Sequence, residues 1–113
     1  MRVYTSYFAK VKGHVNVASV ANSCPSNFPG YHINALVPKW DWVAAYRQSG
    51  DFETLAKLYT EQLDNLGIDK ALKLINDNQI LCCWEANDKP CHRHVLAQWL
   101  RDNGVDCEEL TEV

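Results

Sequence analysis

The stretch that decides the fold is ILCCWEANDKPCHRHVLAQWL, residues Ile80–Leu100. Ile80–Trp84 form a short apolar run, which is typical of a buried strand. Glu85 and a polar turn, residues 87–90, lead into a predicted helix that opens with Cys91, His92 and Arg93. In open α/β sheets, ligands bind at the carboxyl ends of the strands, and a helix N-terminus offers backbone donors to anions. The segment therefore predicts a site in which a carboxylate meets a thiol, an imidazole and a guanidinium.

Helical periodicity orients the side chains of this predicted helix. At ~100° per residue, one apolar stripe is expected to pack on the sheet, and it is formed by Val95, Leu96, Trp99 and Leu100. His92 lies near the middle of the stripe, Cys91 and Arg93 flank it, and His94 falls on the opposite face, where solvent is expected. In the strand, alternation predicts Cys83 and Glu85 on one face and Cys82 and Trp84 on the other.

The rest of the chain predicts a small, mostly parallel sheet flanked by helices. Strands are expected at Arg2–Tyr7, Val15–Val20 and Val105–Leu110. Helices are expected at Trp40–Gln48, from the N-cap Asp51 to Gly67, from the N-cap Asp69 to Ile75, and at Cys91–Asn103. The order of elements is that of an α/β domain with a Rossmann-like three-layer sandwich, although the sequence has no GxGxxG or Walker motif.

Two connections leave the topology open. The link Phe8–His14 is short for a parallel crossover, so it holds either one helical turn or the turn of an antiparallel pair. Ala21–Lys39 is rich in proline and loop-like, and a loop of this length in a small domain is usually functional or a lid.

Composition narrows the class of protein. The 113 residues fit one domain, expected to span residues 1–113, and the hydrophobic fraction of 47% is ordinary. A net charge of -3 argues against extended binding of a nucleic-acid backbone, but it leaves room for a local phosphate site. No signal peptide or membrane-spanning run is expected. Five cysteines without CxxC spacing predict free thiols and a cytoplasmic location.

Motifs along most of the chain are similar to those of a known family. LCCWE at Leu81–Glu85 and CHRHVLAQWL at Cys91–Leu100 resemble a signature of the form LLCYE…FCHR…A-W-L, and Tyr4–Ala9 reads YTSYFA, like the opening of the same family's short members. Further residues recur in the same order: Pro25, Phe28, Pro29, Gly30, the turn Leu36-Val37-Pro38, and Tyr59. On these residues, the chain resembles the small single-domain branch of the DUF488 family.

The resemblance implies a compact α/β domain, common in bacteria and their phages, whose biochemical role is unassigned. For relatives, modification of nucleotides or nucleic acid has been suggested from context alone. One departure concerns the loop before the prolines, where the family often carries an arginine and this chain has Asn22, Ser23 and Cys24. If that arginine binds an anion in the family, the corresponding role is weakened here.

Three residues are candidates for catalysis, and each has a structural alternative. Cys91, at a helix N-terminus beside Arg93, is expected to favour its thiolate and act as a nucleophile, unless it only packs. His92 either works in the site, caps the helix or bonds to a backbone carbonyl. Glu85 is either a general base or the partner of Arg93 in a buried ion pair.

The candidate ligand-binding residues surround the same edge of the sheet. They are Arg93, Tyr4, Thr5, Ser6, Tyr7, Asn22 and Ser23, because the carboxyl ends of parallel strands meet there. The expected ligand is an oxyanion, in particular a phosphate or a nucleotide phosphate. A charge-assisted hydrogen bond contributes about 1.5–3 kcal/mol and a helix dipole about 0.3–1 kcal/mol, so Arg93 is expected to dominate the binding.

The sequence also bears on the roles of the other cysteines and on metal binding. Cys82, Cys83 and Cys107 are expected to pack in the core, and Cys24 to lie exposed in the loop. Cys91 should therefore react with a thiol reagent fastest. Zinc could be held by Cys83, Glu85, Cys91 and His92, but the spacing matches no standard site and Arg93 opposes a cation, so no metal or other cofactor is predicted. A zinc deaminase is excluded because the chain has no H-x-E motif.

Three classes of function remain. The first is a small enzyme that acts on a nucleotide or a nucleic-acid base, with Cys91 or Glu85 doing the chemistry. The second is a non-catalytic sensor of a nucleotide or another anion in the same cleft. The third is a phage-type or accessory protein that works by protein contact through partly exposed tryptophans, with Trp40 or Trp42 expected at the surface. The sequence leaves catalysis and oligomeric state open.

Overall fold

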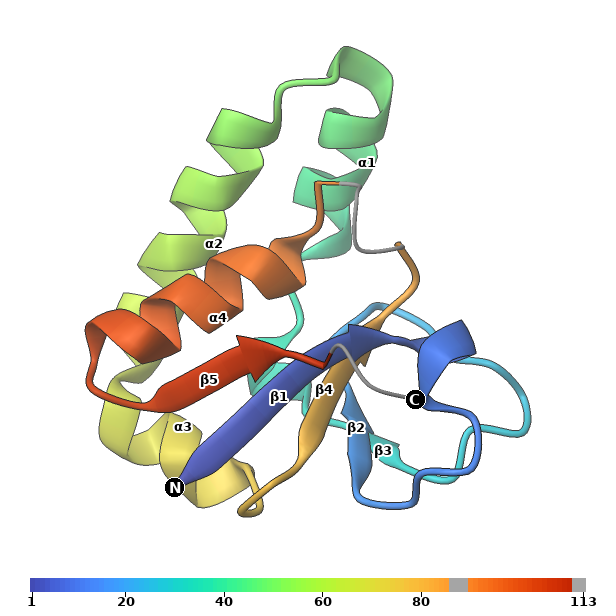
Figure 1. Ribbon diagram of the computed structural model, residues 1–113. Coiled ribbons are helices and arrows are strands. Elements are labelled where there is room, and N and C mark those ends of the chain that lie inside the picture. The colour runs from blue at the N-terminus through green and yellow to red at the C-terminus, as the bar shows by residue number, and fades with distance from the viewer. Residues whose placement is uncertain (86–89, 111–113) are drawn as a thin grey trace.

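The computed structural model describes residues 1–85 and 90–110, which form an α/β fold around a five-stranded parallel sheet (Figure 1). The strands are β1 (Arg2–Tyr7), β2 (Val17–Ser19), β3 (Tyr31–His32), β4 (Ile80–Cys83) and β5 (Asp106–Glu109). The α-helices are α1 (Trp40–Ser49), α2 (Phe52–Leu66), α3 (Ile68–Leu74) and α4 (His92–Asp102). Two 3₁₀ helices are η1 (Phe8–Val11) and η2 (Asn34–Leu36). The predicted fold class is confirmed.

The strand order β3-β2-β4-β1-β5 sets the position of the site. β4 lies between β1 and β2 and pairs with both, so that Ile80 is the register partner of Tyr4 on one side and of Val17 on the other. β1 and β2 run parallel without touching, and the antiparallel alternative for their link is wrong. The link instead holds η1, a single short 3₁₀ helix. All strands therefore point their carboxyl ends toward the same edge.

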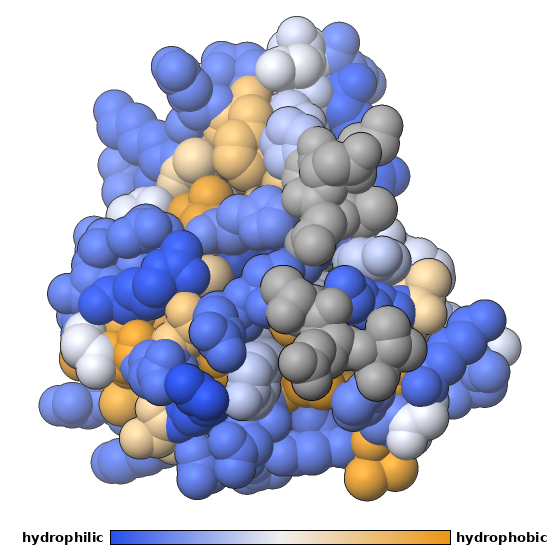
Figure 2. Space-filling model, viewed as in Figure 1, coloured by the Kyte–Doolittle hydropathy of each residue, from blue (hydrophilic) through white to orange (hydrophobic). Residues whose placement is uncertain are grey.

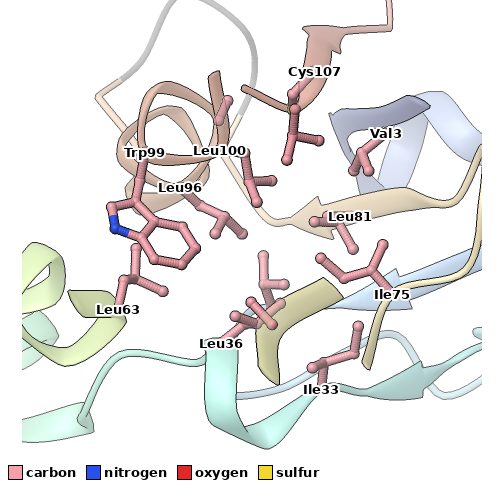
Figure 3. Close-up of a cluster of buried hydrophobic side chains, with 14 of the residues drawn as sticks. Val3, Ile33, Leu36, Leu63, Ile75, Leu81, Leu96, Trp99, Leu100 and Cys107 are labelled. Carbon is pink, nitrogen blue, oxygen red and sulfur yellow. The ribbon is translucent and has the colours of Figure 1, made fainter. Parts of the chain in front are cut away.

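Different elements pack on the two faces of the sheet. On one face, α2, α3 and α4 pack on the strands and form a core with inward side chains from the sheet (Figure 3). Its labelled members include Val3, Leu63, Leu81, Leu96 and Leu100. On the other face, Ile80 and Cys82 pack against η1 and the loop before β3, through Phe8, Val11 and Phe28. The sheet is thus the middle of three layers.

Local signals explain most helix boundaries. Asp51 caps α2, since its Oδ1 accepts from the Thr54 backbone N–H at 3.2 Å and its Oδ2 accepts from the Thr54 hydroxyl at 2.6 Å. Gly67 ends α2 at a φ of 84°, a conformation that favours glycine. The prediction that Asp69 caps α3 is wrong, because α3 begins at Ile68 directly after Gly67 and Asp69 lies inside its first turn.

Three other expectations are refined. The predicted second strand, Val15–Val20, is shorter at both ends in the structure, where it spans Val17–Ser19. The segment 21–39 is not all loop, since it contains β3 and η2. Of the turn predicted at residues 87–90, positions 87–89 lie outside the described residues, as does the tail 111–113.

The surface seen in the orientation of Figure 1 is largely hydrophilic, and hydrophobic side chains gather in a strip between α1 and α2 (Figure 2). Among the described residues, no helix combines the length and the apolar character that crossing a membrane requires.

Candidate functional site at the carboxyl edge of the sheet

A pocket of about 300 Å³ opens where β2 and β4 end and α1 passes over them. Its lining is formed by Ala21, Asn22, Ser23, Trp40, Val43, Arg47, Trp84, Glu85 and His92. Four of these residues, Asn22, Ser23, Glu85 and His92, were candidates from the sequence. The topology therefore brings together residues that are more than 60 positions apart in the chain, at the edge where ligands bind in open α/β sheets.

Helix α1 supplies the part of the pocket that sequence reasoning missed. The guanidinium of Arg47 lies over the ring of Trp40, at 5.3 Å from its centroid. Its Nη2 approaches Oε1 of Glu85 at 4.0 Å, and the Arg47 side chain is 55% exposed. Trp40 and Arg47 are separated by nearly two helical turns, so they share a face of α1. That face could be recognised in the sequence, but its contact with Glu85 depends on how α1 packs.

His92 is a neutral wall of the pocket. Its Nε2 lies 2.6 Å from the carbonyl oxygen of Val20, and because a carbonyl only accepts, Nε2 carries the proton. Burial lowers the pKa of His92 to about 4, so the ring is uncharged at neutral pH. Its Nδ1 is then an acceptor and lies 4.0 Å from Sγ of Cys91. The alternative in which His92 bonds to a backbone carbonyl is confirmed.

Cys91 is the N-cap of α4 and lies behind Glu85, with 3.6 Å between its Sγ and Oε2 of the carboxylate. Its sulfur lies in contact with that of Cys83, so the two residues are placed to form a disulfide, whereas free thiols were expected from the sequence. The two Cα atoms are 7.8 Å apart, wider than the roughly 4.4–6.8 Å of most disulfides, so this backbone suits the reduced pair and closing the bond needs a movement of the backbone.

The remaining cysteines are free thiols, as predicted. Burial raises the pKa of Cys82 to about 12 and that of Cys107 to about 11, which suits packing residues. Cys24 was expected to be exposed and is partly buried. His94, expected in solvent, is partly buried as well.

Arg93 is fully buried and pairs with a residue that sequence reasoning missed. Its Nη2 and Nε donate to the two carboxylate oxygens of Glu109, at 2.8 and 3.1 Å. Its Nη1 donates to the backbone carbonyl of Glu85 and to Sγ of Cys83, the latter at 2.9 Å. The predicted ion pair between Arg93 and the Glu85 carboxylate is therefore wrong. The guanidinium is bound inside the protein and does not line the pocket.

The residues of β1 split between the two faces of the sheet. Thr5 donates its hydroxyl proton to Oε1 of Glu109 at 2.7 Å, and the ring of Tyr7 lies 5.7 Å from Cζ of Arg93. Both residues support the buried ion pair. Tyr4 packs on the opposite face, and alternation places the buried Ser6 on that face too. None of these four residues is part of the pocket lining.

Metal binding has a geometric basis in the same cluster. Cys83, Glu85 and Cys91 each offer one ligand atom, and these atoms lie within 4.8 Å of one another. Two features oppose a cation there: the two sulfur atoms lie against each other, and Nη1 of Arg93 lies against Cys83. The arrangement is better suited to stabilising a thiolate than to holding zinc.

Comparison with known proteins supports the family to which the motifs pointed. No curated protein and no solved structure matches it. The family model described as "Domain of unknown function DUF488" matches residues 8–100, which is well over half of the chain and includes β2, β4 and most of α4. The chain therefore belongs to the DUF488 family, whose function is unknown.

Proposed function

We propose that the pocket binds a nucleotide or a similar phosphate-bearing small molecule, in the cytoplasmic setting predicted from the sequence. The observation that carries the proposal is the position of Arg47, a half-exposed guanidinium at the mouth of a pocket of about 300 Å³. At 4.0 Å its contact with Glu85 is loose, so Arg47 can turn to a phosphate at little cost. Arg47 takes the role that the sequence suggested for Arg93.

The aromatic lining favours a ligand that also has a flat ring. Trp40 is 51% exposed and Trp84 is 47% exposed, and both line the pocket. Stacking of a base on an aromatic side chain contributes about 1–3 kcal/mol and tolerates any base, because every base has a π-face. Glu85 is then left to accept hydrogen bonds from the sugar hydroxyls. The net charge of -3 speaks against extended nucleic-acid binding, so a mononucleotide or a single-stranded end is the better candidate.

The same residues support a finer proposal, that the domain modifies the nucleotide or nucleic-acid base. Glu85 borders the pocket and lies 3.6 Å from Cys91, and neutral His92 offers Nδ1 as a second acceptor. Cys91 would act as the nucleophile after reduction of its bond to Cys83, with Glu85 taking the thiol proton. A non-catalytic sensor would use the binding residues without this chemistry.

The binding proposal is tested by calorimetric titration of the protein with nucleoside monophosphates and with inorganic phosphate. We expect binding of at least one nucleotide that is tighter than that of phosphate. Arg47→Ala should weaken nucleotide binding about tenfold or more, since a charge-assisted hydrogen bond contributes about 1.5–3 kcal/mol. Incubation of the reduced protein with the bound nucleotide, followed by mass spectrometry, distinguishes an enzyme from a sensor.

The matched control is Lys57→Ala, which removes one positive charge from an exposed position of α2 outside the pocket. It should bind nucleotides as the parent does. Absence of binding in the parent, or an equal loss in both variants, contradicts the proposal and favours protein contact through the exposed tryptophans.

A further inference from the structure

The sulfur atoms of Cys83 and Cys91 come from two different elements and lie in contact beside Glu85, which lines the pocket. Cys83 is the last residue of β4 and Cys91 is the N-cap of α4, and eight positions separate them. Cys83 is fully buried and Cys91 is 3% exposed. In a reducing compartment, a disulfide between such residues is usually transient and serves catalysis or redox sensing.

The surroundings of Cys83 favour a thiolate. Nη1 of Arg93 lies 2.9 Å from its sulfur, and the pairing with Glu109 keeps the guanidinium in place. The neighbour Cys82 belongs to the same buried cluster, and burial raises the pKa of its thiol to about 12. What distinguishes Cys83 is the direct contact of its sulfur with the guanidinium of Arg93, a fixed positive charge that favours the thiolate.

The surroundings of Cys91 offer a route for its proton. Oε2 of Glu85 lies 3.6 Å from the sulfur, and the acceptor Nδ1 of His92 lies 4.0 Å away on another side. Glu85 is 37% exposed and lines the pocket, so it connects the buried sulfur with solvent. Of the two sulfurs, that of Cys91 is the one in contact with a carboxylate that lines the pocket.

We propose that Cys83 and Cys91 form a redox-active pair that reduces a small peroxide, with Cys91 as the attacking thiol and Cys83 as the resolving thiol. The inference stands independently of nucleotide binding. The oxidant has to be small because Cys83 is fully buried and Cys91 is 3% exposed.

The atoms and electrons balance over two steps. In the first, Glu85 takes the Cys91 proton, the thiolate attacks one oxygen of the peroxide, the O–O bond breaks, and the leaving hydroxide takes the proton to become water. This step leaves a sulfenic acid on Cys91. In the second step, the thiolate of Cys83 attacks the sulfur of Cys91, and the S–O bond of the sulfenic acid breaks. The leaving hydroxide takes the proton that the Cys83 thiol released and becomes a second water. Two thiols are oxidised to one disulfide for each peroxide reduced, and an external dithiol restores the pair.

The test is a count of thiols in the full chain before and after one equivalent of hydrogen peroxide. The protein is first reduced with a dithiol, which is then removed. After the reaction it is denatured and alkylated, and its mass is measured by mass spectrometry. Five alkylated cysteines are expected in the reduced protein and three after peroxide, with peptide mapping that joins Cys83 to Cys91. Five alkylated cysteines after peroxide, or a disulfide at other positions, would overturn the proposal.

Single substitutions assign the two roles. Cys91→Ser should consume peroxide at least tenfold more slowly, whereas Cys83→Ser should stop at a sulfenic acid on Cys91 that dimedone traps. Cys82→Ser, at the neighbouring buried position, is the matched control and should behave as the parent. If a variant does not fold by circular dichroism, the thiol count of the parent still decides. Equal losses in all three variants, or a one-to-one zinc complex of the reduced protein that resists peroxide, would refute the redox pair.

Discussion

Arg93 holds the carboxyl edge of the sheet together from inside. Its guanidinium is fully buried and contacts Glu109 from β5, the carbonyl of Glu85 after β4, the sulfur of Cys83, and the ring of Tyr7 from β1. A charge without access to water is tolerated when it is paired and hydrogen-bonded on all sides. The positions of Cys83 and of the Glu85 backbone therefore depend on this one residue.

Removal of the carboxylate partner should destabilise the fold strongly. In Glu109→Gln, Arg93 keeps its charge but loses its counter-ion, and breaking a buried pair in this way costs about 3–5 kcal/mol. Because the Glu109 side chain retains 19% exposure, we expect a loss near the lower end of that range. Urea denaturation measures the free energy of unfolding of the variant and the parent.

Glu108→Gln is the matched control, since it makes the same change at the neighbouring, exposed position of β5. It should alter the free energy of unfolding by less than about 0.5 kcal/mol. Similar effects of the two substitutions would show that Arg93 does not depend on Glu109.

The sequence located Arg93 but not its partner, for a physical reason. Glu85 is close to Arg93 along the chain, and proximity suggested an ion pair. The actual partner is set by the strand order, which places β5 beside β1 and brings Glu109 against Thr5. Such a contact between residues 16 positions apart depends on sheet topology, which local patterns do not determine.

Among the elements, the close approach of the loop to β2 depends on Gly30. A Cβ added at this position would lie 2.2 Å from the carbonyl oxygen of Val17 and 2.9 Å from the Phe28 ring. The carbonyl belongs to a strand that is paired on both sides, so it cannot move aside freely. This contact gives a physical reason for a glycine at position 30.

Gly30→Ala should separate the loop from β2 and lower stability by about 1–3 kcal/mol, which is typical of overpacking. Because Asn22 and Ser23 of the pocket belong to the same loop, nucleotide binding should weaken in the same variant. Thermal unfolding and the calorimetric titration check the two effects. Ser26→Ala, at an exposed position of the loop, should change neither, and an unchanged melting temperature in Gly30→Ala would contradict the steric argument.

Prediction of the elements succeeded where the signal was local. Asp51, the apolar spacing of α2 and Gly67 are contained within one stretch of chain, and they gave α2 nearly to the residue. β3 was missed because its two residues form a strand only by pairing with β2. Asp69 was misjudged because Gly67 already ends one helix and begins the next, which leaves no position for a separate cap.

At the scale of the whole molecule, the site lies at the carboxyl edge of the sheet, beside the ends of β2 and β4. The sequence predicted that Glu85, Cys91 and His92 would gather there, since parallel strands end at one edge. It could not reveal Arg47 and Trp40, because their place above the edge depends on how α1 packs against the rest of the chain. The catalytic and binding roles of these residues stay predictions.

The same architecture makes the stability of the protein sensitive to mild acid through His92. The buried ring faces the carbonyl of Val20 and the edge of Tyr59, with Glu85 favouring its charged form and Arg93 and His94 opposing it. Burial outweighs the favourable contacts and lowers the pKa of His92 from its ordinary 6.5 to about 4. Between these two values the unfolded chain binds a proton at this position and the folded protein does not.

Stability should therefore be complete at and above neutral pH and should fall as the pH drops from 6.5 toward 4. The contribution of His92 over this range is about 3 kcal/mol, at 1.36 kcal/mol for each pH unit. Urea denaturation at several pH values measures it, and His92→Gln, which does not titrate, should show a correspondingly flatter dependence. His14→Gln, at a histidine outside the pocket, serves as the control and should keep the slope of the parent. If His92→Gln kept that slope too, other groups would account for the acid sensitivity and the buried neutral ring would have no part in it.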